Sequence, residues 1–291
     1  MEIIVAKKAG FCFGVQRAVD IAFEVADRSS MPAVTLGPII HNPQVIERLR
    51  AKGISAVELI PREKSTIIIR THGIDWKLHE EISRSGHSII DATCPFVKKA
   101  QQYAKLLAEE GYQVLILGDA NHPEVKGILS YAGESALVVS ESADLPPLAS
   151  RVGIVVQTTQ SQDALRGLIG RVLERTKELK VYNTICNSTA LRLKETEAIA
   201  KRADLIFVVG GKNSANTSQL AKLAASLGVR TFHIETAAEI QEEWLSGAAI
   251  VGITAGASTP EWLIGEVKQR LEAIGGKPAY DCGEERTRKP V

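Results

Sequence analysis

Residues 94–123 read CPFVKKAQQYAKLLAEEGYQVLILGDANHP. In this stretch a cysteine is followed by a helix-like segment, an apolar run that ends in glycine, and polar residues before a proline that suits a helix start. The same order recurs after Cys12 and, without the proline, after Cys186, at intervals of 82 and 92 residues (94−12 and 186−94). In each unit a glycine closes the apolar run 24 or 25 residues after the cysteine: Gly37, Gly118 and Gly210. The chain therefore repeats one small unit three times, and three thiols in matching positions indicate one central site.

Strands alternate with helices in every unit, which predicts parallel sheets joined by right-handed crossovers. Apolar residues at helical spacing follow Cys12 and Cys94, and a helix is also expected over 261–274. The pattern after Cys186 is weaker, with Leu191, Ala198 and Ile199 among many charges. We therefore expect an α/β fold of three similar lobes with small, mainly parallel sheets, in a pseudo-threefold, trefoil-like arrangement.

The repeat also predicts where the lobes begin and end. We expect a first lobe over 13–94, a second over 95–186 and a third over 187–281, the last completed by an N-terminal strand within 1–12. Residues 282–291 read as a polar C-terminal tail.

Composition limits the possible partners. With 45% hydrophobic and 24% charged residues the chain has an ordinary globular composition. A net charge of +1 and only 5% aromatic residues argue against nucleic acid as a partner. No apolar run approaches the roughly 18 residues of a membrane span, and the first residues resemble a strand rather than a signal peptide. We expect a cytoplasmic protein, in which the four cysteines are not paired as disulfides.

Thiolates from three units suit an iron–sulfur cluster, because the paired Cys-x-x-Cys spacing of zinc sites is absent. A cubane cluster normally takes four thiolates, so three leave one iron open as a Lewis acid beside its role in electron transfer. The expected cofactor is therefore [4Fe-4S], or [3Fe-4S] where the open iron is lost. Cys282 offers an alternative, because as a fourth ligand it would close the cluster; we favour a free thiol, since the N-terminal strand already fills that sheet position.

Polar residues gather at the predicted helix starts and after the late strands. Pro43 and Pro123 suit first helical positions, and Asn216 or Thr217 suits a helix cap. Backbone N–H groups at helix starts favour anions. Hydrogen-bond donors with little fixed charge accompany them: His41, His72, His122, Ser214, Asn216 and Ser258. The set predicts a phosphate or diphosphate ligand, while the remaining histidines (His79, His87 and His233) read as structural or surface groups.

Glu124 is the one carboxylate within such a loop, and its counterpart in the first unit is Gln44, which does not titrate. A glutamate in a first helical turn often only complements the helix dipole. Here it breaks the symmetry of a site that needs a proton donor, so we interpret Glu124 as a general acid.

Several motifs, in this order, resemble the 4-hydroxy-3-methylbut-2-enyl diphosphate reductase family of the non-mevalonate isoprenoid route. They are GFCFGV at 10–15, GPIIHN at 37–42, DATCP at 91–95, NHPE at 121–124, QTT at 157–159 and ICNST at 185–189. One departure is Ala215, where the family often has serine; Ala215 offers only its backbone N–H.

The resemblance implies three lobes around a central iron–sulfur cluster held by Cys12, Cys94 and Cys186. It also implies substrate contacts, most of them to the diphosphate, from His41, His72, His122, Thr158, Ser214, Asn216 and Ser258. Glu124 corresponds to the proton donor of the family, helped by Thr158. The implied reaction is reductive dehydroxylation of the allylic diphosphate to isopentenyl and dimethylallyl diphosphate, with reduced ferredoxin or flavodoxin as electron donor.

Two other classes remain open at this point. A metal-dependent phosphatase would use the histidines and a carboxylate but would leave the three thiols without a role. A closed-cluster electron carrier would need Cys282 and would leave the diphosphate donors unexplained.

Overall fold

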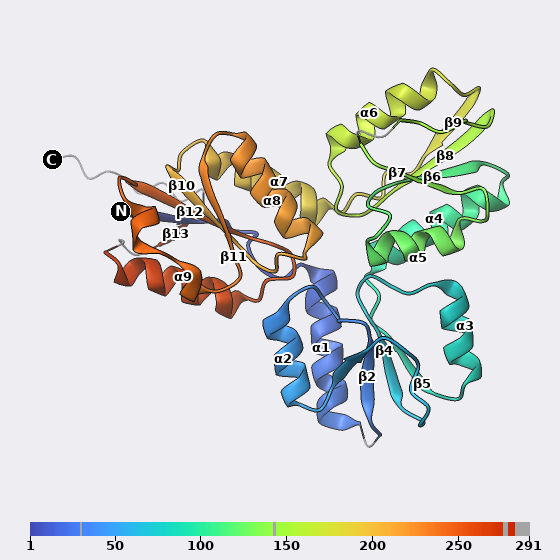
Figure 1. Cartoon of the computed structure of the whole chain (residues 1–291), viewed down its shortest axis with the longest axis horizontal. Coiled ribbons are helices and arrows are strands. Elements are labelled where there is room, and N and C mark those ends of the chain that lie inside the picture. The colour runs from blue at the N-terminus through green and yellow to red at the C-terminus, as the bar shows by residue number, and fades with distance from the viewer. Residues whose placement is uncertain (30, 142–143, 276–278, 283–291) are drawn as a thin grey trace. The chain divides into compact units, whose positions relative to one another are not determined.

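The structure is a computed structural model that describes residues 1–29, 31–141, 144–275 and 279–282 (Figure 1). The described chain divides into two compact units. One unit runs from Phe13 to Asn187, and the other joins Met1–Cys12 to the described residues from Ser188 onward. Of the predicted tail, only Cys282 falls within the described residues.

The first sheet of the Phe13–Asn187 unit is parallel, with the strand order β3-β2-β4-β5. Its elements are α1 (Phe13–Arg28), β2 (Ala33–Leu36), α2 (Pro43–Ala51), β3 (Ser55–Val57), β4 (Thr66–Ile69), α3 (Trp76–Arg84) and β5 (Ser88–Asp91). The central strand β4 is buried along its whole length, and Ile82 of α3 packs in the same apolar cluster as Ile67 and Ile69. A strand covered on both faces is consistent with its uninterrupted apolar sequence.

The second sheet of this unit is also parallel, with the order β7-β6-β8-β9. Its elements are α4 (Pro95–Glu109), β6 (Gln113–Leu117), α5 (Pro123–Tyr131), β7 (Leu137–Val139), β8 (Arg151–Val156), α6 (Gln162–Leu173) and β9 (Glu178–Val181). Alternate residues of β6 face opposite sides, as the two-residue period of a strand requires. Val114 packs with Leu107 of α4, whereas Leu115 packs with Leu168 of α6.

The other unit holds a third parallel sheet, in the order β11-β10-β12-β1-β13. Its elements are β1 (Glu2–Val5), α7 (Asn187–Ala200), β10 (Leu205–Val209), α8 (Ala215–Ser226), β11 (Arg230–Ile234), η1 (Ala237–Glu239), η2 (Glu242–Leu245), β12 (Ile250–Ala255), α9 (Glu261–Ala273) and β13 (Tyr280–Asp281). Phe207 of β10 packs with α9 on one face, and Val208 packs with Leu220 of α8 on the other. The N-terminal strand β1 lies between β12 and β13, so the first residues of the chain belong to its last sheet.

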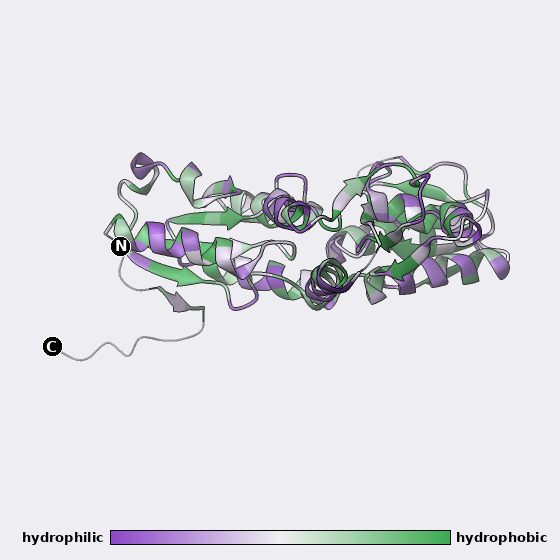
Figure 2. Cartoon of the chain, turned by 90° about the horizontal axis from the view of Figure 1, so that it is seen from below, coloured by the Kyte–Doolittle hydropathy of each residue, from purple (hydrophilic) through white to green (hydrophobic). Residues whose placement is uncertain are grey.

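These sheets confirm the predicted α/β class with small parallel sheets. Figure 2 shows the strands mainly in hydrophobic colours, with hydrophilic residues along the helices that cover them. The helix expected over 261–274 is confirmed to within one residue as α9. None of the helices in the described ranges combines the length and apolar character that a membrane crossing needs.

Helix α7 explains the weak pattern after Cys186. Its buried face includes Thr189, Arg192 and Thr196, whereas Leu191 is 50% exposed and Ala198 is also exposed. The Thr196 and Thr254 hydroxyl groups lie 2.9 Å apart and share a hydrogen bond. Polar residues thus replace much of the usual apolar stripe, and a periodicity of apolar residues alone describes this helix poorly.

Candidate functional site

The three repeat cysteines share one backbone arrangement. Each donates its N–H to the carbonyl of the second residue after the neighbouring strand: Cys94 to Thr71 at 3.0 Å, Cys186 to Thr158 at 2.9 Å and Cys12 to Ala257 at 3.1 Å. The strands concerned are β4, β8 and β12, so each thiol begins beside the polar loop at the carboxyl end of its own sheet. Ligands of parallel α/β sheets bind at these strand ends.

The three repeat cysteines are only partly buried. Cys12, Cys94 and Cys186 are each partly exposed, and none of the four cysteines, all within the described ranges, forms a disulfide. Cys94 precedes Pro95 at the start of α4 and makes no side-chain capping bond. Opposite it lies Gly14, where a Cβ atom would come within 2.4 Å of the Cys94 sulfur. The absence of a side chain at Gly14 therefore makes room for the Cys94 side chain itself.

Cys282 has different surroundings. It follows β13, donates its N–H to the Val5 carbonyl at 2.7 Å, and packs against the apolar cluster that includes Ile4 and Ile206. Its place against the core resembles that of an ordinary half-buried cysteine.

Three imidazoles meet within the Phe13–Asn187 unit. His41 follows β2, His72 follows β4, and His122 is the N-cap of α5, so two come from the first lobe and one from the second. Their ring centroids are 4.4 Å (His41–His72), 5.6 Å (His41–His122) and 5.4 Å (His72–His122) apart. One ring nitrogen of each lies within 4.8 Å of the others. The sequence singled out these residues, and the fold brings them together.

Lowered pKa values favour the neutral form of all three rings near pH 7. Burial is the largest cause that lowers the pKa of each ring, and Arg70 adds to the effect on all three. Neighbouring imidazoles lower the pKa of His72 and His122 further, whereas Asp119 raises that of His122. The pKa of His122 falls to about 4, and that of His72 lies well below its usual value of 6.5. Neutral rings each carry one N–H donor, so the cluster offers hydrogen bonds to an anion; an anion bound there would in turn favour protonation.

Glu124 lies at the second position of α5, directly after Pro123, and is 2% exposed. Its Oε1 accepts the Thr158 backbone N–H at 2.6 Å, and its Oε2 accepts the Thr158 hydroxyl at 2.9 Å. Its own backbone N–H donates to Nδ1 of His122 at 3.2 Å. Since Thr158 also bonds Cys186 through its carbonyl, one chain of contacts joins His122, Glu124, Thr158 and Cys186.

Burial raises the pKa of Glu124 from 4.5 to about 7, although the two hydrogen bonds from Thr158 act in the opposite direction. A carboxyl group with a pKa near 7 is partly protonated at neutral pH. It is therefore suited to deliver a proton as a general acid.

The same helix position differs among the lobes, where it is held by Gln44, Glu124 and Asn216. Asn216 Oδ1 accepts the Ala257 backbone N–H at 2.9 Å, just as Glu124 accepts that of Thr158. The buried Oε1 atom of Gln44 has no hydrogen-bond partner among the described residues. The second position of the helix is thus an amide side chain in two lobes and a carboxylic acid in one. Of these groups, the acid is the one that can transfer a proton.

Ser214, Asn216 and Ser258 lie together in the other unit. The Ser214 hydroxyl accepts the Thr217 N–H at 3.4 Å, and the Ser258 hydroxyl donates to Ser214 at 3.2 Å. Ser214 is therefore the N-cap of α8, and the prediction of Asn216 or Thr217 as the cap is wrong. The serine hydroxyl reaches the N–H three residues ahead, as capping serines do.

The two units divide the predicted site residues between them. The Phe13–Asn187 unit contains His41, His72, His122, Glu124, Thr158, Cys94 and Cys186. The other unit contains Cys12, Ser214, Asn216 and Ser258.

Two arginines that steady the cysteine loops were missed by the sequence reasoning. Arg17 of α1 donates to the Thr93 carbonyl next to Cys94, and Arg192 of α7 donates to the Gly10 carbonyl two residues before Cys12. Both lie in the second turn of a helix that follows a repeat cysteine. An arginine in the second turn of the helix after a repeat cysteine was the sequence feature that could have identified them.

Comparisons with known proteins show which family this chain resembles. The model of the family described as LytB protein matches residues 3–272. A 4-hydroxy-3-methylbut-2-enyl diphosphate reductase from Pelobacter propionicus is 49% identical over 280 residues, which cover 95% of this chain and 100% of that protein. The same-named protein of Geobacter sulfurreducens is 48% identical over 281 residues, covering 95% of this chain and 99% of the relative.

Two solved structures are also similar. One, described as (E)-4-hydroxy-3-methyl-but-2-enyl diphosphate reductase, the terminal enzyme of the non-mevalonate pathway, has 42% identity and a TM-score of 0.71. The similarity covers 94% of this chain and all of that one. A diphosphate reductase from Plasmodium falciparum shares the fold at a TM-score of 0.86 and 24% identity, over all of this chain and 95% of that one.

Proposed function

This chain belongs to the LytB protein family, and from that premise we propose that it reduces 4-hydroxy-3-methylbut-2-enyl diphosphate to isopentenyl and dimethylallyl diphosphate. The reaction consumes two electrons and two protons: the C–O bond breaks, the hydroxyl leaves as water with one proton, and an allylic carbon takes the other. The observation that carries the proposal is Glu124, a buried carboxyl with a pKa of about 7, held by Thr158 next to the histidine cluster.

The family is one of iron–sulfur enzymes, and the cysteines of this chain fit such a cofactor. Cys12, Cys94 and Cys186 are partly exposed residues outside disulfides, each at the carboxyl end of a sheet, and a side chain at Gly14 would displace the Cys94 sulfur. We propose that these three thiolates hold a [4Fe-4S] cluster, or [3Fe-4S] after loss of one iron. When bound, the cluster supplies electrons and, at an iron without a protein thiolate, a Lewis-acid position for the substrate hydroxyl.

The residues of the chain then have separate tasks. His41, His72 and His122 donate N–H groups to the diphosphate. Because the lowered pKa values favour neutral rings, these residues bind the anion through hydrogen bonds rather than through fixed positive charge. Ser214, Asn216 and Ser258 offer further polar groups for the same ligand, next to the N-terminus of α8.

Glu124 delivers the proton on which the loss of water depends. Thr158 holds the carboxyl through both its backbone N–H and its hydroxyl, which fixes the direction in which the acid points. Burial keeps the proton on the acid near neutral pH, since the ionised form is poorly solvated there.

An anaerobic assay tests the proposal, with the hydroxylated diphosphate as substrate and reduced methyl viologen as electron source. We expect two viologen radicals to be oxidised for each substrate consumed, together with both isoprenyl diphosphates and no free phosphate. Release of inorganic phosphate without oxidation of the dye would instead indicate a phosphatase. The natural electron donor, a reduced ferredoxin or flavodoxin, and a cytoplasmic location remain predictions.

A further inference from the structure

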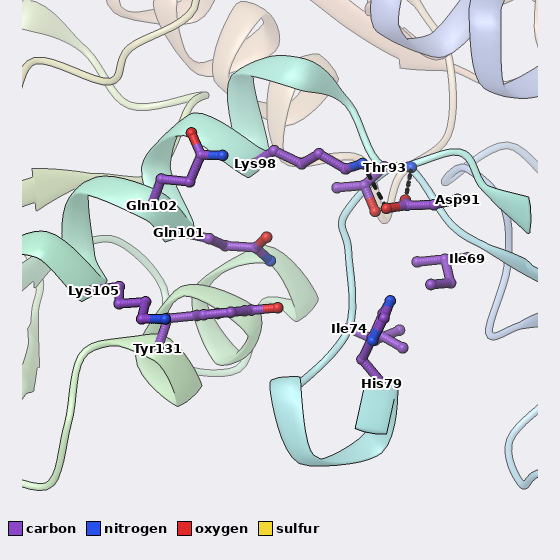
Figure 3. A pocket seen from close by; sticks show the side chains of 10 residues that line it. All are labelled: Ile69, Ile74, His79, Asp91, Thr93, Lys98, Gln101, Gln102, Lys105 and Tyr131. Atoms are coloured by element: carbon purple, nitrogen blue, oxygen red, sulfur yellow. Dashed lines mark hydrogen bonds and ion pairs between the residues drawn. The ribbon is translucent and has the colours of Figure 1, made fainter. Parts of the chain in front are cut away.

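A cavity of about 290 Å³ opens within the Phe13–Asn187 unit, bordered by residues that have no role in the proposed reaction (Figure 3). Its wall includes Lys98, Gln101 and Lys105 of α4, Tyr131 at the end of α5, and Ile69 and Ile74 of the first lobe. The cavity therefore lies where the first two lobes meet. Its volume approaches the lower end of the range typical of small-molecule sites.

Gln101 is the residue of this cavity that most directly indicates a ligand. Its side chain is 7% exposed, yet the Nε2 atom has no hydrogen-bond partner among the described residues. In Figure 3 its amide points toward the middle of the cavity, on the side facing Tyr131 and Ile74. Buried amide donors are normally paired, so this one is prepared for an acceptor atom that enters from outside.

The amide is held in place by close packing. A Cβ atom at Gly73 would lie 2.7 Å from Gln101 Nε2, and one at Gly127 would lie 3.1 Å away. Gly73 directly follows His72, and Gly127 lies three residues after Glu124. An acceptor bound to Gln101 is therefore one side chain away from the backbone that carries the proposed active-site residues.

The charges of the wall favour a single negative charge. Lys98 pairs with Asp91 at 2.6 Å, whereas Lys105 is exposed and its ion pair to Glu109 is longer, at 3.7 Å. The Asp91 carboxylate would repel a ligand that carries several negative charges. The Lys105 side chain can turn toward a ligand that carries a single negative charge. The buried Ile69 and Ile74 add an apolar surface opposite these polar groups.

We propose that this cavity binds a small organic monoanion, a carboxylate with a short apolar body. Its carboxylate accepts the Gln101 Nε2–H and approaches Lys105, and its apolar part lies against Ile69 and Ile74. The site is separate from the proposed diphosphate site, so both ligands bind at once.

Calorimetric titration of the anaerobic holoenzyme with 4-methylpentanoate tests this, with inorganic diphosphate present to occupy the histidine cluster. We expect one carboxylate per chain, and binding weaker by about tenfold for the neutral isostere 4-methylpentanamide, because a charge-assisted hydrogen bond is lost. Failure of the carboxylate to bind, equal binding of the amide, or loss of carboxylate binding when diphosphate is added would each overturn the proposal.

Variants locate the binding. Gln101→Glu keeps the size of the side chain but replaces the donor with an acidic group, and Lys105→Gln removes the exposed cation without altering the core. Each substitution should weaken the binding of 4-methylpentanoate by about tenfold. The control Lys222→Gln replaces an exposed lysine of α8 and should not change the affinity. If Gln101→Glu does not fold, the Lys105→Gln variant still tests the proposal. Unchanged affinity for 4-methylpentanoate in Lys105→Gln contradicts the assigned site.

Discussion

Gly14 and Cys94 are in such close contact that a Cβ atom on the glycine would lie 2.4 Å from the sulfur. Gly14 belongs to α1 of the first lobe, and Cys94 precedes the first residue of α4 in the second. A glycine inside a helix normally costs stability. Here the missing side chain makes room for the Cys94 thiol, which a side chain at position 14 would displace.

Replacing Gly14 by alanine should therefore reverse the usual effect of that substitution. In an open helix, Gly→Ala stabilises a protein by roughly 0.5–1 kcal/mol, whereas overpacking costs roughly 1–3 kcal/mol. We expect Gly14→Ala to lower both the unfolding midpoint and the iron content. Gly167→Ala is the matched control, since no atom of the described residues lies within 4 Å of a Cβ built at that position of α6. Iron content equal to wild type in Gly14→Ala would show that the space has no role.

The cysteines should separate into two classes. Cys94→Ser or Cys186→Ser should lose most of the iron and acid-labile sulfide, because a serine hydroxyl is a poor ligand for iron in a cluster. Cys282→Ser should keep both, since that side chain packs against an apolar cluster. Iron, sulfide and the visible absorption of anaerobically purified protein measure the difference. Loss of the cluster in Cys282→Ser would instead favour a fourth ligand and the electron-carrier alternative.

Glu124→Gln should abolish proton delivery while leaving the cofactor in place. General acids contribute about 10²- to 10⁴-fold to a rate, so we expect kcat to fall within that range with unchanged iron and absorption. The exposed Glu174→Gln on the far end of α6 is the control and should retain full activity. Activity of Glu124→Gln near the wild-type level would refute the acid role.

Thr158 tests the positioning of that acid. Thr158→Val removes the hydroxyl that Glu124 Oε2 accepts, while Thr158→Ser preserves it. We expect the valine variant to lose turnover and the serine variant to retain most of it. The alkaline limb of the pH–rate profile should also move upward in the valine variant, because the lost hydrogen bond had lowered the pKa of Glu124.

Glu124 should also leave a mark on stability. Its carboxyl titrates at 4.5 in the unfolded chain and at about 7 in the fold, so the native state holds the proton more tightly. The stabilisation from this group is complete below pH 4.5 and is lost as the pH rises through 7, by about 3 kcal/mol at most. The Glu124→Gln variant has no carboxyl group at this position, so it does not lose stability in this way as the pH rises. Its stability relative to wild type should therefore increase from pH 5 to pH 8, as measured by thermal unfolding of both proteins; parallel pH profiles would contradict the raised pKa.

The histidines have the opposite linkage. Because the pKa of His72 and His122 is lowered by folding, the stabilisation from the neutral rings is complete above 6.5 and is lost as the pH falls. In wild type this trend opposes that of Glu124 between about pH 4.5 and 6.5. Acid sensitivity should consequently be more evident in Glu124→Gln.

Much of the lobe structure could be predicted from local patterns. The helix periodicity after Cys12 and Cys94, the prolines that begin α2 and α5, and the buried central strands all follow from neighbouring residues in the chain. The prediction was poorer for α7, whose buried face carries Thr189, Arg192 and Thr196. Those residues are buried because they meet partners far away in the sequence, and no local period records that.

The chain alone determined which residue types stand at equivalent points of a repeated unit: three cysteines, three helix starts, and one acid where the first lobe has the amide Gln44. Repetition is a property of residue order, so it can be read without coordinates. Folding decided the chemistry of those residues, since the pKa of Glu124 and of the imidazoles depends on burial by segments distant in the chain. It also decided that Gln101 ends beside a cavity with a donor that no described residue pairs, because that cavity exists only where two lobes meet.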